Sequence, residues 1–362
     1  MGKEPWRSIS LGIVRSPEVR LSVREARESP CDSCETVPCC SHLPLHSFRV
    51  ENMIGFDHAR YLLNFDRIEL GISASGQWQV YYRYPCRFLE RSSFRCKLHG
   101  SPEQPSVCEH YNPYSCWYRR TLQRGETDGF VRIDRTRLEA LGEQIVFDRD
   151  RNIVDVPDWS TLCKTVAKLD SVRLVEGDEN IGVDPQRTAW QRQVVERSAP
   201  ERPAELRRFA QLRDPCTGCG AHCCRVLMFP IPTPETYGSL DYLKFSLGFP
   251  GVEIGVSDEG WSIVVSTTCR HLRDDRCSVY GRSERPILCS YYDASHCAYK
   301  PQFSVPRPES LLRLQLEDFA TLAGSVEFDD QGAITNLPTK NELRDLIEQG
   351  WRAAAGAQPG ER

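Results

Sequence analysis

Cysteine is the residue type whose number and spacing point to chemistry in this sequence. The chain has 17 cysteines among 362 residues, a share well below the roughly 8–10% of small disulfide scaffolds. We find no secretory signal, so we expect a reducing, cytoplasmic location, where clustered thiols more often bind metal or do redox chemistry than form disulfides. We therefore interpret the cysteines first as metal ligands.

Sixteen of the cysteines form two series of eight that repeat in register. The first series is Cys31, Cys34, Cys39, Cys40, Cys86, Cys96, Cys108 and Cys116, and the second is Cys216, Cys219, Cys223, Cys224, Cys269, Cys277, Cys289 and Cys297. Corresponding members lie 181 to 185 residues apart, and both series end in C-x11-C-x7-C. This drift requires only small changes in loop length. Cys163 has no counterpart, so the repeat does not need it.

The repeat extends beyond cysteine. Residues 39–76 align without a gap with residues 223–260. The identical pairs include Leu43 and Leu227, Asp57 and Asp241, Leu63 and Leu247, Phe65 and Phe249, and Glu69 and Glu253. We predict that one module was copied once and that both copies share one fold.

Apolar and polar residues follow the same pattern in both modules and predict an α+β fold with short helices and β-hairpins around a metal-binding core. The predicted elements are helices near 57–65 and 235–247, hairpins over 68–84 and 252–267, and closing hairpins over 145–154 and 326–335. Strand periodicity places Cys86 and Cys269 on an apolar face at a strand end, so we expect both to point inward. The later cysteines fall in turns and short helices.

The chain is predicted to divide into two small cysteine-rich domains. The expected boundaries are a first cysteine-cluster module at 15–170, a linker at 171–206, a second module at 207–350 and a disordered tail at 351–362. The linker is assigned from its Arg, Glu and Pro content.

The cysteine spacing indicates soft-metal chemistry, because thiolates favour zinc, copper(I) and iron–sulfur clusters. A C-x2-C pair can bind one metal centre through two sulfurs from a tight turn. This spacing occurs at Cys31 with Cys34 and at Cys216 with Cys219. Neighbouring side chains diverge, so the adjacent pairs at 39–40 and 223–224 are expected to serve two sites, or to ligate through one member. Each module could hold two zinc sites or one four-cysteine cluster, and all sixteen repeated cysteines are candidate ligands. His222 and His271 lie close enough in sequence to add a ligand.

Other functional classes find little support. The net charge of −4 and pI near 6.1 argue against nucleic acid as the main partner. No apolar run is long enough to span a membrane, and no nucleotide-binding loop, serine-hydrolase elbow or HExxH motif occurs. The repeated carboxylates are interpreted as structural. Asp57 and Asp241 fit helix caps, and Glu69 and Glu253 fit the polar face of a hairpin.

The motifs of the second module resemble a known family. The chain reads C-T-G-C-G-A-H-C-C-R from Cys216, C-R-H-L-R-D-D-R-C-S-V-Y from Cys269 and R-S-E-R-P-I-L-C-S-Y-Y from Arg282. With these motifs it resembles the YkgJ-type cysteine-cluster proteins, described as zinc- or iron-chelating domains and sometimes labelled Fe–S oxidoreductases. The resemblance is close over the second series and looser over the first. It implies metal binding and does not by itself specify a reaction.

Two classes of function follow from these observations. The first is a metal-binding protein with two cysteine-ligated zinc or iron–sulfur centres and an electron-transfer or redox role, as in an Fe–S oxidoreductase with a redox partner. The alternative is a structural-zinc interaction module without catalytic activity. Metal ions are the expected partners in both cases.

The two modules differ in the charged residues near their cysteines. Ser41 stands where the second module has Arg225, and Gln104 stands where it has Arg285. Zinc held by four thiolates carries net negative charge, and a nearby guanidinium can offset it and donate hydrogen bonds to sulfur. We therefore predict that the second module holds the working centre, unless both arginines are turn residues, as Arg285 before Pro286 also allows.

Overall fold

The computed structural model describes residues 37–111, 116, 130–169, 219–280, 282, 284–292, 294, 297–305 and 308–356. Cys31, Cys34, Cys216 and the predicted linker at 171–206 lie outside these residues. We call the described residues up to 169 the first half and those from 219 the second half. Within this described part, no helix combines the length and apolar character needed to cross a membrane.

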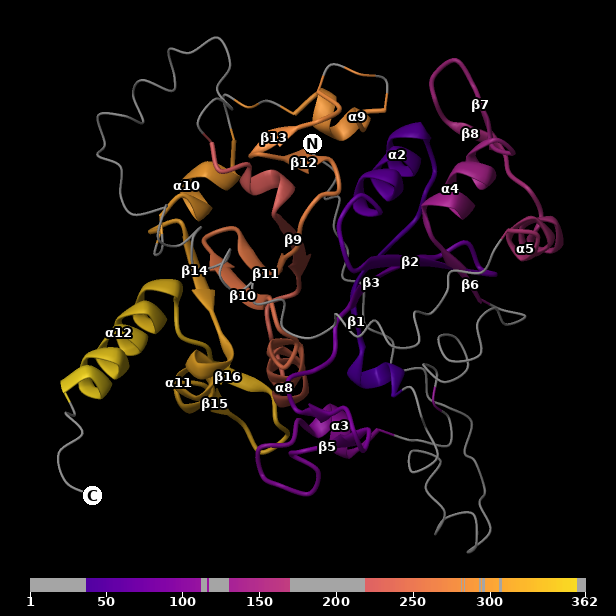
Figure 1. Cartoon of the computed structure of the whole chain (residues 1–362). Helices are drawn as coiled ribbons and strands as arrows, with labels where there is room; N and C mark the ends of the chain where they lie inside the picture. The colour runs from indigo at the N-terminus through magenta and orange to yellow at the C-terminus, as the bar shows by residue number, and fades with distance from the viewer. Residues whose placement is uncertain are drawn as a thin grey trace, which may run out of the picture.

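The fold is α+β, with small antiparallel sheets and short helices (Figure 1). The elements of the first half are η1 (Pro38–Cys40), β1 (His42–Phe48), α2 (Met53–Leu62), β2 (Ile68–Ser73), β3 (Trp78–Arg83), β4 (Leu89–Glu90), β5 (Arg95–Cys96), α3 (Ser106–Glu109), β6 (Phe130–Ile133), α4 (Arg135–Gly142), β7 (Val146–Phe147), β8 (Ile153–Asp155) and α5 (Trp159–Ala167). This confirms the predicted fold class.

The second half repeats much of this order. Its elements are η5 (His222–Cys224), β9 (Val226–Ile231), α8 (Tyr237–Leu247), β10 (Val252–Ser257), β11 (Gly260–Ser266), β12 (Leu272–Arg273), β13 (Arg276–Cys277), α9 (Ile287–Ser290), α10 (Tyr299–Phe303), β14 (Leu311–Leu314), η7 (Leu316–Asp318), α11 (Phe319–Gly324), β15 (Glu327–Phe328), β16 (Ile334–Asn336) and α12 (Lys340–Gly356). The tail expected from residue 351 overlaps the end of α12.

The main sheets of the two halves have the same topology. The first is ordered β1-β3-β2-β6 and the second β9-β11-β10-β14, and the pairings are antiparallel in both. The central hairpins β2–β3 and β10–β11 are those expected from alternation in the sequence. The outer strands were not predicted. A shared topology is what a copied module requires, while the copying event itself stays a prediction.

Local capping sets where α2 and α8 begin. α2 starts four residues before the predicted position because the Asn52 side chain accepts a hydrogen bond from Gly55 N at 2.8 Å. α8 begins after Thr236, whose side chain and that of Ser239 form a reciprocal capping box. In each half the helix lies between the adjacent cysteine pair and the central hairpin along the chain.

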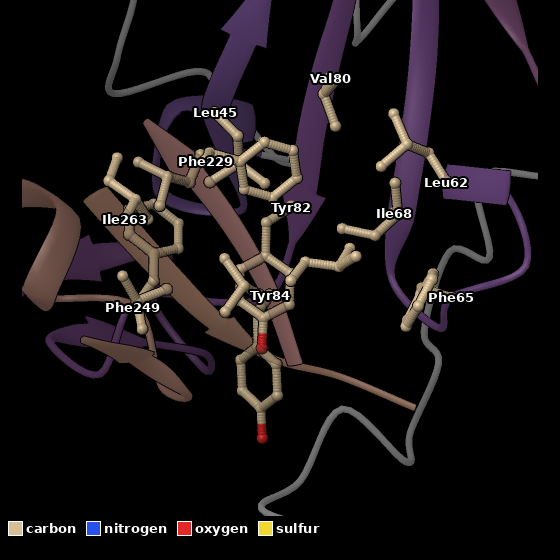
Figure 2. Packing of buried hydrophobic residues seen from close by; sticks show 14 of the residues in the cluster. Leu45, Leu62, Phe65, Ile68, Val80, Tyr82, Tyr84, Phe229, Phe249 and Ile263 are labelled. Carbon is tan, nitrogen blue, oxygen red and sulfur yellow. The ribbon is translucent and has the colours of Figure 1, made fainter. Parts of the chain in front are cut away.

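One hydrophobic core runs through both halves. Buried side chains of β1 and β3 join those of β9, β11 and the loop after α8 in a single cluster. Figure 2 shows Leu45 and Tyr82 of the first half together with Phe229, Phe249 and Ile263 of the second. Each of these side chains contributes roughly 1.5–3 kcal/mol when fully buried, so the described halves stabilise each other.

The halves also exchange their cysteine-bearing segments. The short helix α3 of the first half packs on α8 of the second, and α9 of the second packs on α2 of the first, as Figure 1 shows. Matching backbone bonds support the exchange, with Arg87 N donating to Gly248 O at 2.9 Å and Arg270 N donating to Asn64 O at 2.7 Å. The sequence pattern did not predict this arrangement.

Glu69 lies in a buried ionic cluster on the face of the first sheet away from α2. Its carboxylate pairs with Arg132 from β6 and with Arg83 from β3 at 2.9 Å. His42 Nε2 from β1 lies 3.7 Å away, and burial lowers the pKa of its ring to about 4. Only 13% of its side chain is exposed. This geometry fits the predicted structural role of Glu69. Its side chain is buried, however, and does not face solvent as expected for the polar face of a hairpin. The cluster ties together the strands that lead from Cys40 and toward Cys86.

Candidate metal centres

The adjacent cysteines of the first half lie at the start of the main sheet. Cys39 and Cys40 form η1 after Val37, which adopts a left-handed conformation with φ 33°. Their sulfurs are 4.0 Å apart, close to the separation of two ligands on one tetrahedral zinc, given Zn–S bonds of about 2.3 Å. The sequence-based expectation that the two side chains diverge is therefore not met, because the tight 3₁₀ turn brings them together.

The same geometry recurs in the second half. Cys223 and Cys224 lie in η5 after Ala221, whose φ is 52°. The thiol of Cys224 lies near those of Cys223 and Cys269, close enough for the three to shift one another's pKa values. Three of the predicted ligands are thus neighbours in space.

A backbone hydrogen bond fixes the inward cysteine beside each pair. Cys86 N donates to Cys40 O at 2.7 Å, and Cys269 N donates to Cys224 O at 2.8 Å. Cys86 and Cys269 are half-buried and pack against the shared core, as strand periodicity predicted. The scaffold therefore holds three cysteines together in each half through the main chain.

The next two cysteines of each series approach the same region from different elements. Cys96 and Cys277 end the two-residue strands β5 and β13, and Cys108 and Cys289 occupy the third positions of α3 and α9. Each group is close enough for its members' charges to interact. We call these groups the first thiol cluster (Cys39, Cys40, Cys86, Cys96 and Cys108) and the second thiol cluster (Cys223, Cys224, Cys269, Cys277 and Cys289).

The pKa values of the thiols reflect burial and crowding. Burial and then the neighbouring sulfurs raise the pKa of Cys108 to about 12, and the same causes raise that of Cys289 to about 12. Contact with Cys224 lowers the pKa of Cys223 and of Cys269 to about 7. Crowded anionic sulfurs repel each other unless a cation lies among them, and a bound metal ion deprotonates the thiols that coordinate it.

The final cysteine of each series lies beside a tyrosine. Tyr111 Oη is 3.5 Å from Cys116 Sγ, and Tyr292 Oη is 3.4 Å from Cys297 Sγ. These contacts give the last two predicted ligands a polar partner. Cys219 is half-buried, and its charge interacts with that of Cys223.

The donor set fits a soft metal by its chemistry, although the thiols do not enclose a point in space. Among the residues that the structure describes, no three His, Cys, Asp or Glu side chains are arranged to hold a metal ion. Each thiol cluster nevertheless brings five sulfurs from four segments to one region, and sulfur is the preferred ligand of zinc and iron–sulfur clusters. Binding would require these side chains to move toward a common point.

The two histidines near the second cluster have other partners. His222 is buried, and its Nε2 lies 3.2 Å from Ser304 Oγ. His271 Nε2 lies 3.4 Å from Arg135 Nη1. Burial lowers the pKa of His222 to about 4 and, as the largest cause, also lowers that of His271. Both side chains contribute to packing and polar contacts here.

The two arginines that distinguish the second module have different surroundings. Arg225 donates to Gly220 O at 2.9 Å and pairs with Asp275, so its charge is already matched. The Arg285 guanidinium lies 4.2 Å from the centre of the Tyr280 ring, and its charge acts to lower the pKa of Cys223 and of Cys289. Arg285 is therefore the arginine placed to act on the second cluster.

We expect Arg285→Gln to weaken metal binding by the second cluster about tenfold at unchanged saturation. At an effective dielectric constant of about 20, one neighbouring charge is worth about 1–3 kcal/mol before screening. Competition with a zinc chelator of known affinity measures the change. The matched variant is Gln104→Arg. It should not raise the metal affinity of the first cluster, because Gln104 is buried and accepts a hydrogen bond from Gly100 N at 2.7 Å. Equal changes in both clusters would contradict the prediction.

Two cavities in the described residues lie away from the cysteines. One of about 120 Å³ lies against Glu69 and Arg132, and one of about 150 Å³ lies between β14 and α12. The thiol clusters instead lie where the exchanged segments meet the opposite half. The junction is not closed to solvent, because Cys108 of α3 is exposed and Cys289 of α9 is only half-buried.

Comparisons of the chain with family models, with curated proteins and with solved structures find no match. The resemblance to the YkgJ-type proteins therefore rests on the cysteine motifs alone and stays a prediction.

Proposed function

We propose that the chain is a metal-binding protein with one cysteine-ligated zinc or iron–sulfur centre in each half. The observation that carries the proposal is the convergence of four cysteine-bearing segments on equivalent points of two sheets that share one topology. Isolated buried cysteines need no such convergence. The ligands are drawn from the first thiol cluster in one half and from the second in the other.

A bound metal supplies a positive charge that stabilises thiolates and, if it is an iron–sulfur cluster, a site for an electron. The protein's own residues hold the sulfurs. The hydrogen bonds from Cys86 N to Cys40 O and from Cys269 N to Cys224 O set the spacing of three ligands in each half. The exchanged helices α3 and α9 bring a further cysteine to each group.

Elemental analysis of the purified full-length chain tests the proposal. We expect at least two equivalents of zinc plus iron per chain when the protein is made in rich medium. Less than one equivalent, with the thiols open to a labelling reagent, would contradict it. The control is the same preparation after denaturation and dialysis against chelator, which sets the baseline for adventitious metal.

A structural-zinc role is the second candidate, favoured by the position of both clusters at the junction of the halves. Zinc there would brace two halves that already share a core. Anaerobic purification separates the two proposals. A coloured protein with iron and sulfide supports a redox centre, and a colourless protein with stoichiometric zinc supports the structural role.

A further inference from the structure

The two short helices that carry Cys108 and Cys289 begin at a proline. Pro105 precedes α3 and Pro286 precedes α9, and neither provides a side-chain capping bond. Proline has no side-chain oxygen, so the first N–H groups of each helix need an acceptor from elsewhere. An uncapped single turn is too short to persist on its own.

In both cases the acceptor comes from the opposite half. Asp57 of α2 accepts hydrogen bonds from Ile287 N at 2.6 Å and from Leu288 N at 3.4 Å. Asp241 of α8 accepts one from Val107 N at 3.1 Å. The two aspartates are counterparts in the sequence repeat, and only 6% and 5% of their surfaces are exposed. A helix cap was predicted for these residues, but it belongs to the other half's helix.

We propose that Asp57 and Asp241 are positioning residues that act across the halves, Asp57 on Cys289 of the second thiol cluster and Asp241 on Cys108 of the first. The bonded amides lie one residue before Cys108, and one and two residues before Cys289. Fixing these amides fixes the direction in which the cysteine side chain leaves the helix. This inference deepens the proposed metal-binding function and rests on it.

The acceptor oxygen, and not the negative charge, is what the helix needs. Both carboxylates are buried, and burying a charged group costs free energy. An asparagine side chain would supply the same acceptor oxygen without the charge. A group kept at such a site despite these costs is kept for its hydrogen bonds.

The exchange also links the two centres along the chain. α2 lies between Cys40 and Cys86, so a metal bound by the first cluster holds both ends of the segment that carries Asp57. α8 lies between Cys224 and Cys269 in the same way. Metal binding at one centre therefore orders the aspartate that positions a cysteine of the other centre. By linkage, metal binding at the second centre favours binding at the first to the same extent.

Site-resolved alkylation of the full-length chain tests the proposal. Zinc-loaded wild type, Asp57→Ala and Asp241→Ala are treated with iodoacetamide, and the modified peptides are quantified by mass spectrometry. We expect Asp57→Ala to speed alkylation of Cys289 about tenfold and that of Cys108 less than twofold, because a lost cap is worth about 1–2 kcal/mol. Asp241→Ala should give the mirror image.

Two conservative variants and one control complete the test. Asp57→Asn and Asp241→Asn keep an acceptor oxygen and should restore the protection that alanine loses. Glu139→Gln removes a carboxylate that pairs with Arg60 of α2 at 3.1 Å and should leave Cys289 unchanged. The proposal would be overturned if alkylation became faster in the half that carries the substitution, or equally faster in both thiol clusters. It would also be overturned if the asparagine variants did not regain the protection from alkylation.

Measurements on the unsubstituted protein guard against a variant that fails to fold. Amide hydrogen exchange should show protection at Ile287 and Val107, and exchange at the rate of an open turn would overturn the proposal. The zinc and iron content of wild-type protein as purified tests the metal-binding function separately. A protein that binds neither metal but shows the crossed alkylation pattern would retain the positioning role and lose the proposed function.

Discussion

Replacing Cys224 with serine is expected to remove one metal equivalent from the chain and leave the other in place. Cys224 adjoins Cys223 in η5 and accepts the backbone hydrogen bond from Cys269 N at 2.8 Å, so its loss removes the sulfur at the middle of the second thiol cluster. A zinc ion present at a thousand times its dissociation constant stabilises the fold by about 4 kcal/mol, which lowers the melting temperature by on the order of 5 °C when it is lost. Elemental analysis after gel filtration and differential scanning calorimetry measure the two effects.

Matched variants make this test specific. Cys40→Ser should remove one equivalent from the first cluster, and the double variant should remove both. The control is Cys163→Ser, since Cys163 packs against the core on α5 and has no counterpart in the repeat. Loss of metal from the control, or unchanged metal in both single variants, would contradict the assignment.

The sequence allowed prediction of the elements whose signals are local. Strict alternation in Ile68–Ser73 and Trp78–Arg83, separated by a turn with Gly76 at φ 76°, identifies the first central hairpin. The equivalent hairpin in the second half follows from the same pattern. Their register puts Cys86 and Cys269 beside the core, which explains why strand periodicity alone placed these two cysteines correctly.

The outer strands of the sheets depend on contacts that are distant in sequence. β1 carries Pro44 and a register shift between Pro44 and His46, which interrupts its alternation. β6 is only four residues long and pairs with β2 from far along the chain. Neither strand has a local pattern strong enough to be recognised, and both are defined by the hairpin on which they pack.

The exchange between the halves is also beyond local patterns. Periodicity shows that one face of α2 or α8 is apolar, but it cannot say which half supplies the partner. The one available signal was the pair Asp57 and Asp241, identical acids within otherwise apolar helical patterns. A buried acid at matching positions indicates an obligatory hydrogen-bond donor, and the structure shows that this donor belongs to the opposite half.

Glu69→Gln is expected to destabilise the protein by about 3 kcal/mol at pH 7, because it leaves buried positive charge without a partner. Glu69 pairs with Arg132 and Arg83 in the first half. The matched variant is Glu253→Gln in the second half, where the ion pair with Arg313 is 3.5 Å long and both side chains are mostly buried. We expect this variant to cost less than Glu69→Gln, because it removes one long ion pair in place of two shorter ones. Urea denaturation of both variants with metal bound measures the difference.

The pH dependence gives this prediction a second, independent readout. Burial acts to raise the pKa of Glu69, but Arg132, His42 and Arg83 outweigh it and lower the pKa below its usual value. The stabilisation is therefore fully present above the pKa of an unfolded glutamate, near 4.3, and is lost as the pH falls through the lower folded value. The difference in free energy of unfolding between wild type and Glu69→Gln should shrink over that pH range. A difference that is constant with pH would show that the variant acts through packing.

The same variant links the scaffold to the first thiol cluster. The Glu69 cluster joins β1, which follows Cys40, to β3, which leads to Cys86. Loosening this junction should therefore release metal from the first cluster faster than from the second. Chelator-driven release, followed by peptide-resolved alkylation, compares the two clusters in one chain. Faster release from the second cluster would show that the ionic network supports the fold without holding the site.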